Sequence, residues 1–174
     1  WLYNAAGQVT IELDADFGDG DGRIITRDLQ INGGSDLAEH FSVNKYNSTE
    51  VKPGMLVSID EKNEGKLKIT DAANDKKIVG IISGANGIKA GMLMSQQGTI
   101  ADGEYPVALA GRVYVLTNKE GGEINAGDFL TSSSVKGVAK KVTNFSDTQG
   151  AIIGKAMGKA DPKTGYVLVL VNLQ

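Results

Sequence analysis

Val51-Lys52-Pro53-Gly54-Met55-Leu56-Val57 returns twice along the chain with small changes. The second copy is Ile88-Lys89-Ala90-Gly91-Met92-Leu93-Met94, and the third is Ile124-Asn125-Ala126-Gly127-Asp128-Phe129-Leu130. Each copy has a β-branched residue, a polar residue, Pro or Ala, Gly, and then a mainly hydrophobic stretch. Because Pro and Gly favour the central positions of tight turns, each copy predicts a turn that leads into a strand. The copies are 37 and 36 residues apart, a spacing that favours an assembled β architecture over a catalytic motif.

Two of the three copies open a longer duplication. The copies at Gly54 and Gly127 are each followed by an apolar segment with an internal glycine and then by a closing apolar segment. These segments are Ile78–Gly84 and Tyr105–Ala110 in the first unit, and Ile152–Gly158 and Tyr166–Leu170 in the second. We interpret them as two equivalent β lobes, at about residues 51–110 and 124–172. The copy at Gly91 has no such continuation and is interpreted as a separate use of the same turn.

The composition is that of a globular chain with many tight turns. The 174 residues include 23 Gly, 3 Pro and no Cys, and 41% of them are hydrophobic. This length suits one compact domain with an appendage. The lack of Cys excludes disulfides and thiol catalysis. The net charge of −3, with both signs interspersed, does not indicate a nucleic-acid partner.

No part of the sequence predicts insertion into a membrane. No apolar run reaches membrane-spanning length, and no cationic-then-apolar signal segment begins the chain. The first residue is Trp1 rather than Met, so we expect the chain to be an excised or processed piece of a longer protein.

Residues 1–34 differ from the rest of the chain and predict an extended β stalk. Apolar and polar residues alternate over residues 9–13, as in a half-buried strand. A Gly/Asp turn follows at Gly18–Gly22, and residues 23–31 form a second extended stretch. Because an isolated hairpin is marginal in water, these strands need neighbours from other chains or from the rest of the protein. We therefore expect an intertwined homotrimeric stalk.

Residues 35–174 are expected to form a C-terminal β domain. From Val43 onward the chain predicts strands almost throughout, and Asn86-Gly87 is a strong hairpin-turn signal. The exception is Ser35–Phe41, for which we predict a helical turn capped by its first or second residue. The fold class is therefore predicted to be all-β, with a duplicated lobe that is barrel-like or sandwich-like. The expected strands are residues 55–59, 66–69, 78–83, 91–95, 105–116, 128–132, 138–142, 151–157 and 166–172.

Two carboxylates in the expected helical turn are the candidate catalytic residues. Asp36 and Glu39 are three residues apart, which on a helix places both on one face. Paired carboxylates can raise one pKa and so supply an acid and a base. Asn32-Gly33-Gly34 lies immediately before them, and two of these residues have no side chain. The flexible backbone at this point is therefore open to attack by groups of the same chain. The alternative is a capped turn in which the Glu39 carboxylate binds backbone amides.

Closely spaced aspartates suggest a calcium loop. With Asp28 as the last ligand, Asp19 and Asp21 fall at the third and fifth positions of such a loop, and Gly22 falls at the sixth. The first position would be Phe17, and the flanking segments predict strands rather than helices, so the alternative is a solvated Asp/Gly turn. Calcium bound by these three aspartates is the only cofactor that the sequence suggests.

The single histidine, His40, does not indicate a metal site or a catalytic triad. It has no Cys and no second His as a partner, so a zinc site is not expected. No serine lies in a nucleophile-elbow sequence, and no phosphate-binding glycine loop is present. His40 is therefore interpreted as an ordinary side chain.

The order of several segments carries a family resemblance. The segment Ser35–Phe41 contains an Asp, a hydrophobic residue, Ala, Glu and an aromatic residue. The segment Lys52–Ile59 is predicted to be a Pro/Gly turn that leads into a strand. The segment Val79–Ser83 is predicted to be an apolar strand that contains a glycine. These segments resemble the C-terminal domains, of the intramolecular-chaperone and autocleavage type, of phage neck-appendage and tail-fibre proteins. Related bacterial tail-fibre-like proteins carry segments similar to Tyr105–Val113, Ala126–Ser133 and Ile152–Ala156. The resemblance covers about residues 35–172.

The resemblance implies a trimeric fibre-tip domain that follows a β stalk. In such families the domain trimerises, brings three chains into register and, in some members, is then cut off. Asp36 and Glu39 correspond to the Asp and Glu of the family's opening motif. His40 and Ser42 differ from the residues that cleaving members tend to show around the aromatic, so a non-cleaving relative that stays attached is an open alternative.

The expected function is therefore structural, as a trimerisation domain at the tip of a phage or phage-like tail fibre or appendage. Its location would be the virion or an extracellular appendage, and its partners would be further copies of itself and the upstream stalk. One alternative is a self-cleaving intramolecular-chaperone peptidase that cuts near the stalk–domain junction. The other is binding of a host cell-surface receptor or glycan by exposed loops. The few aromatic residues in the C-terminal domain form no obvious sugar-stacking cluster: Tyr46, Tyr105, Tyr114 and Phe145.

Overall fold

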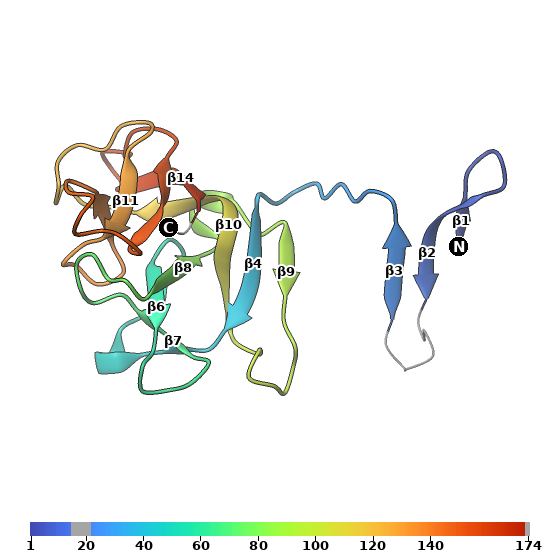
Figure 1. The fold of residues 1–174 in the computed structure, drawn as a ribbon, viewed down its shortest axis with the longest axis horizontal. Coiled ribbons are helices and arrows are strands. Elements are labelled where there is room, and N and C mark those ends of the chain that lie inside the picture. Colours follow the sequence, from blue (N-terminus) through green and yellow to red (C-terminus); the bar gives the residue numbers. More distant parts are fainter. Residues whose placement is uncertain (15–21, 173–174) are drawn as a thin grey trace. The chain divides into compact units, whose positions relative to one another are not determined.

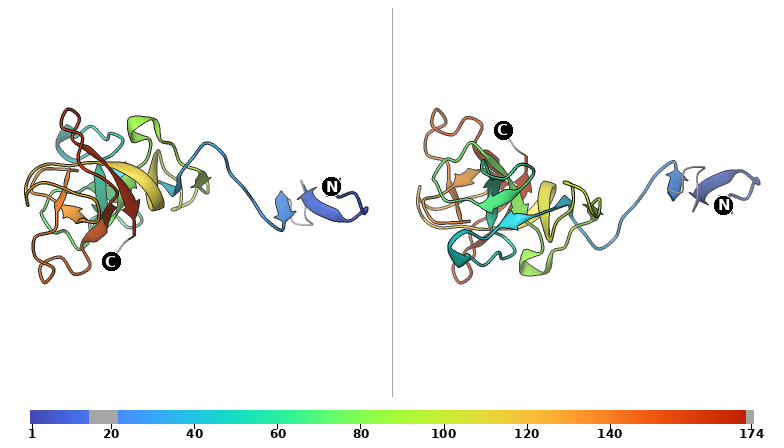
Figure 2. Two further views of the ribbon diagram at one scale, coloured as in Figure 1. Left: turned by 90° about the horizontal axis from the view of Figure 1, so that it is seen from above. Right: turned by 90° about the horizontal axis from the view of Figure 1, so that it is seen from below.

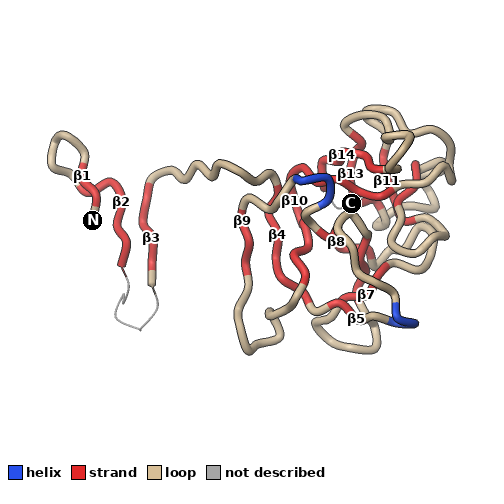
Figure 3. The backbone as a smooth tube through the Cα atoms, turned by 180° about the vertical axis from the view of Figure 1, so that it is seen from behind, coloured by secondary structure: helices blue, strands red, loops and turns tan. Residues whose placement is uncertain are grey.

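Almost all regular structure in this protein is β-strand (Figure 3). The computed structural model describes residues 1–14 and 22–172. The prediction of an all-β protein is confirmed. Within the described residues, the helical elements are two short 3-10 turns, η1 (Tyr46–Ser48) and η2 (Ala85–Gly87). Neither of these described turns has the length or apolar character to span a membrane.

The chain divides into two compact units, Trp1–Asn32 and Gly33–Gln174. The first unit is a three-stranded antiparallel sheet in which β2 (Val9–Asp14) lies between β1 (Leu2–Tyr3) and β3 (Arg23–Thr26). The second extended stretch expected in this region is a paired strand only as far as Thr26.

The second unit contains one eleven-stranded sheet (Figure 1). Neighbouring strands follow the order β12-β11-β13-β14-β10-β8-β6-β7-β5. Outside this order, β4 pairs with both β10 and β9. The first and last strands of the order do not pair with each other among the described strands, so the sheet is not closed into a barrel. The strands are β4 (Asp36–Phe41), β5 (Val43–Asn44), β6 (Leu56–Ile59), β7 (Leu67–Ile69), β8 (Ile78–Ile82), β9 (Met92–Met94), β10 (Tyr105–Leu116), β11 (Phe129–Ser132), β12 (Ala139–Lys141), β13 (Ile152–Ala156) and β14 (Tyr166–Val171).

Two sets of four strands in this unit pair in the same way. In one set the order is β7-β6-β8-β10, and in the other it is β12-β11-β13-β14. Both sets contain a register shift at the equivalent position, between Val57 and Ser58 in β6 and between Leu130 and Thr131 in β11. The sets meet where β10 pairs with β14, so the strand order reads as two matching halves.

The repeated turn has the same geometry in two of its three copies. Gly54 and Gly127 have φ angles of 88° and 90°, a left-handed conformation that glycine adopts without strain. Their amides donate 2.8 Å hydrogen bonds to the carbonyl oxygens of Ile82 and Ala156, at the ends of the equivalent strands β8 and β13. Gly91 is not left-handed, and its amide donates to the Asp36 carbonyl. The Gly91 copy is therefore a different structural element, and the other two copies are equivalent.

The long strand β10 runs through the middle of the second unit and is drawn in yellow in Figure 2. Its first half pairs with both β4 and β8, and its second half pairs with β14. A register shift near Ala108 and Ala110 and the left-handed Gly111, with φ of 99°, separate these halves. Val113 and Val115 from its second half are fully buried in the larger core cluster with residues of both strand sets.

The predicted helical turn at Ser35–Phe41 was wrong. Residues 36–41 form strand β4, which pairs antiparallel with β10 and parallel with β9. The local capping pattern favours a turn, but two sheet neighbours satisfy the backbone of this segment and override the local preference. Ala38 in its centre is fully buried, as expected for a strand with neighbours on both sides.

The Asn86-Gly87 signal predicted the turn correctly but not the hairpin. Both residues have positive φ angles, 52° and 78°, as the turn requires. The flanking strands β8 and β9 do not pair with each other, because β9 pairs with β4 instead. The turn therefore redirects the chain toward a different part of the sheet.

We expect Gly80→Ala to destabilise the protein by about 1–3 kcal/mol, because overpacking against a fixed backbone costs this much. A Cβ atom at Gly80 would lie 2.8 Å from the carbonyl oxygen of Ala108 in β10 and would also meet the Val107 side chain. Chemical denaturation measures the change. Gly158→Ala is the matched control, since a Cβ atom at that position would meet no other atom within 4 Å, and equal effects of the two substitutions would contradict the prediction.

Candidate functional site

Asp36 begins strand β4 with its side chain inside the protein. The residue is 4% exposed and lies opposite Gly111 of β10. Neither carboxylate oxygen accepts a hydrogen bond from the described residues, and the buried Ser83 hydroxyl also lacks a partner there. Burial raises the pKa of the Asp36 carboxyl above its ordinary value, and the nearby Ser83 hydroxyl offsets part of this effect. Asp36 is therefore a buried acid that holds its proton more tightly than an exposed one.

Glu39 lies on the other face of the same strand. Because successive strand side chains alternate, residues three apart point to opposite faces. Glu39 is half-buried and lies beside Met94 of β9, where the two line an open cavity of 210 Å³. The structure therefore does not bring the two predicted catalytic carboxylates together on one face, and the helical argument for pairing them was wrong. Their assignment as catalytic residues stays a prediction.

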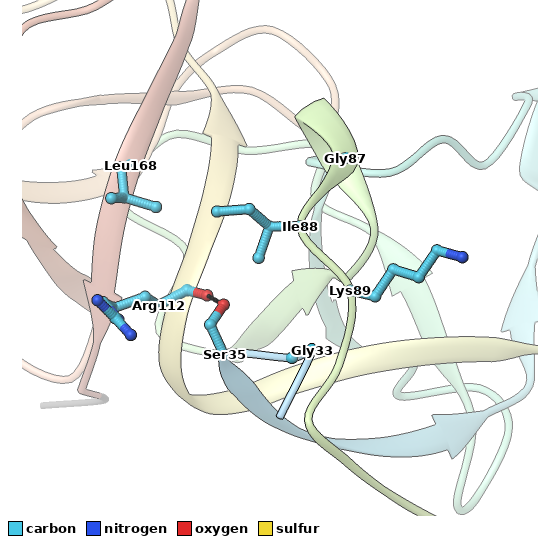
Figure 4. A pocket seen from close by; sticks show the side chains of 8 residues that line it. Gly33, Ser35, Gly87, Ile88, Lys89, Arg112 and Leu168 are labelled. Carbon is cyan, nitrogen blue, oxygen red and sulfur yellow. Dashed lines mark hydrogen bonds between the residues drawn. The ribbon is translucent and has the colours of Figure 1, made fainter. Parts of the chain in front are cut away.

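A cavity of 360 Å³ lies where the chain enters the second unit (Figure 4). In Figure 4 the Ile88 side chain is directed toward Leu168, while the ammonium group of Lys89 extends away from the Arg112 guanidinium. A preformed anion site requires its cations to point toward one place. The Lys89 and Arg112 side chains do not do so. The Ser35 hydroxyl donates a 2.7 Å hydrogen bond to the Arg112 carbonyl and so ties β4 to β10. The lining residues are Gly33, Gly34, Ser35, Gly87, Ile88, Lys89, Arg112 and Leu168.

The predicted calcium ligands are only partly within the described residues. Asp19 and Asp21 lie outside them. Asp28 is exposed, and its backbone carbonyl accepts a 3.0 Å hydrogen bond from the Thr26 hydroxyl. Over residues 1–14 and 22–172, no group of three His, Cys, Asp or Glu side chains is arranged to hold a metal ion. Calcium binding stays a prediction.

His40 lies in β4 opposite Pro106 of β10 and is half-buried. The described part of the chain gives it no hydrogen bond or ion pair through its side chain. The interaction of His40 with Asp102 contributes to the lowered pKa of that carboxyl. The interpretation of His40 as an ordinary side chain stays a prediction.

Asp60 is the centre of a polar cluster that the sequence did not indicate. Its carboxylate is buried and accepts hydrogen bonds from the Asn44 amide, the Tyr46 hydroxyl at 2.7 Å, the Asn63 amide at 2.9 Å and the Lys62 backbone amide at 3.0 Å. Burial alone would raise the pKa of Asp60, but these donors outweigh it and hold the pKa well below its ordinary value. Asp60 is therefore a fixed anion that positions the surrounding side chains.

The cluster opens into a polar cavity of 310 Å³. Tyr46 is 39% exposed at its wall, and the Lys62 ammonium lies 6.0 Å from the centre of the Tyr46 ring. Lys68 and Asp71 form a 2.9 Å ion pair in the same wall. Lys136 reaches this cavity from the loop between β11 and β12, so both strand sets contribute to it. This cavity is the place where the glycan-binding alternative could be sought, and that alternative stays a prediction.

Comparison with solved structures gives a similarity in three dimensions, whereas the two sequence comparisons give no match. No protein-family model matches the chain, and no curated protein matches it. Among solved structures, the chain is similar to the pre-mature gene product 12 of bacteriophage phi29, with 18% identity and a TM-score of 0.49. The similarity covers 88% of this chain and 23% of that one, so the chain spans about a quarter of that protein's length. A likeness of this size assigns neither a family nor a function.

We expect Asp36→Asn to raise the melting temperature at pH 7.5, with a gain that shrinks as the pH falls toward 4. Burial raises the folded-state pKa of Asp36 above its ordinary 3.8, so a cost to folding grows as the pH rises above 3.8 and is complete above the folded-state pKa. That cost disappears once the carboxyl is protonated in both the folded and the unfolded state. Thermal denaturation between pH 4 and pH 8 measures the effect.

Glu64→Gln is the control for this pH series, since Glu64 is an exposed acid in the β6–β7 loop and its substitution removes one carboxylate without changing the surroundings of Asp36. A stabilisation by Asp36→Asn that is equal at every pH would contradict the prediction.

Proposed function

We propose that this chain is a structural, trimer-forming domain of a phage or phage-like tail fibre or appendage. In this proposal residues 33–174 associate around a threefold axis and fix the register of the N-terminal strands. The proposal takes its biological setting from the sequence resemblance that begins at Ser35. Its physical support comes from the surface of the N-terminal unit.

The observation that carries the proposal is the exposure of the apolar side chains in Trp1–Asn32. No side chain described in this unit is buried. The apolar side chains that are at least 43% exposed are Trp1, Leu2, Tyr3, Val9, Leu13, Ile24, Ile25, Leu29 and Ile31. Burying one such side chain contributes about 1.5–3 kcal/mol, so this surface gains much from a partner. Patches of this kind mark interaction sites on soluble proteins.

A second copy of the same unit is the simplest partner for these strands. In β2 and β3, Leu13 and Ile24 lie directly opposite each other and are 59% and 64% exposed, so they form an exposed apolar pair, here called the apolar strip. A two- or three-stranded ribbon with this little buried surface is marginal by itself. Association of three copies would bury these strips against each other and would also pair or cover exposed strand edges.

We expect the chain to sediment as a trimer, with a mass three times its 18.3 kDa. Ile24→Glu should weaken the trimer, because it places a charge in the apolar strip that the proposal buries. Val135→Glu is the control, since Val135 is 51% exposed in the loop between β11 and β12, outside the N-terminal unit. Sedimentation equilibrium measures both, and a stable, well-folded monomer of the unmodified chain would refute the proposal.

Self-cleavage near the junction of the two units is the second candidate function. The observation that favours it is the buried Asp36, whose raised pKa suits a proton donor, next to exposed Gly33 with a φ of 110°. Glu39 would have to act from the other face of β4, so Asp36 is the more important residue for this candidate function.

If cleavage occurs, the purified chain should release a fragment that ends close to residues 33–36, and Asp36→Asn should stop the release. Loss of a buried proton donor typically costs about 10²–10⁴-fold in rate. Mass spectrometry of the chain over several days measures the products, and Glu64→Gln is the control. An intact chain throughout would exclude this candidate and leave the structural proposal standing.

A further inference from the structure

The edge of the second unit carries an apolar patch, here called the edge patch, formed by Met92, Leu93 and Met94. These three residues of β9 are 43%, 49% and 42% exposed. Successive strand residues point to opposite faces, so exposure of all three means that both faces of β9 are partly open to solvent. Among the described strands β9 pairs with β4 alone, which leaves its other edge open. It also contains none of the Lys or Pro residues that commonly protect such edges.

A second apolar patch, here called the face patch, lies on the outer surface of β13 and β14 and consists of Met157, Leu168 and Leu170. In β14 the three valines are buried, while Leu168 is half-buried and Leu170 is 47% exposed on the opposite face. Met157, directly after β13, is 48% exposed and donates its amide to the Leu168 carbonyl. A strand that is apolar on both faces is typical of a strand covered on both sides. The outer side of β14 therefore lacks its cover.

The two patches carry opposite charges. Leu170 lies directly between Arg112 and Lys155 on the neighbouring strands, and the described residues provide neither cation with an ion pair. The Lys155 ammonium lies 4.7 Å from the centre of the Phe129 ring, and the Arg112 side chain is exposed. The edge patch instead has Glu39 opposite Met94, also without an ion pair in the described chain.

The loop after β9 carries a second acid near the edge patch, because Ala101, next to Asp102, lines the same cavity as Glu39 and Met94. Asp102 accepts hydrogen bonds from the amides of Gly98 and Gly103, and these bonds lower the pKa of its carboxyl, so it is a fixed negative charge. The edge patch is therefore apolar and acidic, and the face patch is apolar and basic.

The chain enters the second unit between the two patches. The Ser35 amide donates to the Lys89 carbonyl at 3.1 Å, just before the edge patch, and its hydroxyl donates to the Arg112 carbonyl beside the face patch. The Gly91 amide completes this connection by donating to the Asp36 carbonyl at 2.8 Å. If three chains enter together near a common axis, the surfaces that flank this point face the neighbouring copies.

We propose that the edge patch of one copy docks on the face patch of the next copy. This inference rests on the trimer proposed above and names the surfaces that form it. Glu39 of one copy then lies near Arg112 and Lys155 of its neighbour, and apolar side chains fill the centre of the contact. Because the contact joins two different surfaces, it is heterologous, and repeating it about the proposed threefold axis gives a closed ring rather than a twofold dimer. Glu39 has a structural role in this arrangement, as one half of a contact between copies.

Chemical cross-linking between separate copies tests this inference directly. The chain has no Cys, so Met94→Cys and Leu170→Cys can be made in two different preparations, refolded together and treated with a short bismaleimide. We expect the mixture to give a cross-link between positions 94 and 170 that exceeds any 94–94 or 170–170 product by about tenfold, a difference of about 1.4 kcal/mol in contact preference. Mixing Met94→Cys with Val135→Cys is the control, and it should give no comparable product.

Charge reversal provides a second measurement on the same contact. Glu39→Lys and Arg112→Glu should each weaken trimer association by about tenfold, and the variant with both changes should recover part of the loss. Circular dichroism of each variant establishes that it is folded before its association is measured.

The outcomes separate this inference from the proposal on which it rests. A trimer with the 94–170 cross-link supports both. A trimer that gives no 94–170 cross-link, or gives mainly 94–94 or 170–170 products, overturns the proposed contact and leaves the trimer intact. A monomeric chain overturns both.

Discussion

The pairing of strand β10 with three different strands is the constraint on which the second unit depends. Its first half is held between β4 and β8, and its second half pairs with β14 over six register positions. One strand can do this only if its backbone changes direction between the halves, and Gly111 supplies the required left-handed residue. A Cβ at Gly111 would also meet the Ser35 carbonyl and the Asp36 backbone. The pairing of the two strand sets and the position of β4 thus both depend on the short segment of β10 around Gly111.

The turn-strand pattern predicted most of the fold because it is local. Every strand expected between residues 55 and 172 is present, with small differences at the ends. The failures are at Ser35–Phe41 and Asn86-Gly87, where partners far away in the sequence decide the outcome. The capping pattern at Ser35–Phe41 gave no helical turn, whereas the turn at Asn86-Gly87 formed without the expected hairpin. No local pattern contains the information that β9 pairs with β4.

For the candidate site residues, too, the features that depend on distant parts of the chain were the ones that the sequence did not predict. Asp36 and Glu39 were chosen on a helical spacing, and the strand separates them onto two faces. Asp36 pairs with β10, and the Ser83 hydroxyl that offsets part of the effect of burial on its pKa comes from a residue 47 positions away in the sequence. Asp60 was missed for a related reason. Its turn neighbours, Lys62 and Asn63, are visible in the sequence, but the amide and hydroxyl donors at Asn44 and Tyr46 reach it only in the folded protein.

The position of β4 also determines how the second unit would respond to mechanical load. Strand β4 is held by an antiparallel ladder to β10 and a parallel ladder to β9, so consider a pull on Gly33 that is directed along β4. The ladder hydrogen bonds lie across the direction of the pull, so it loads them together in shear instead of opening them one after another. A domain attached through such a strand resists extraction far better than one attached through the end of a hairpin. Tension transmitted along the preceding segment would therefore be distributed over the centre of the sheet.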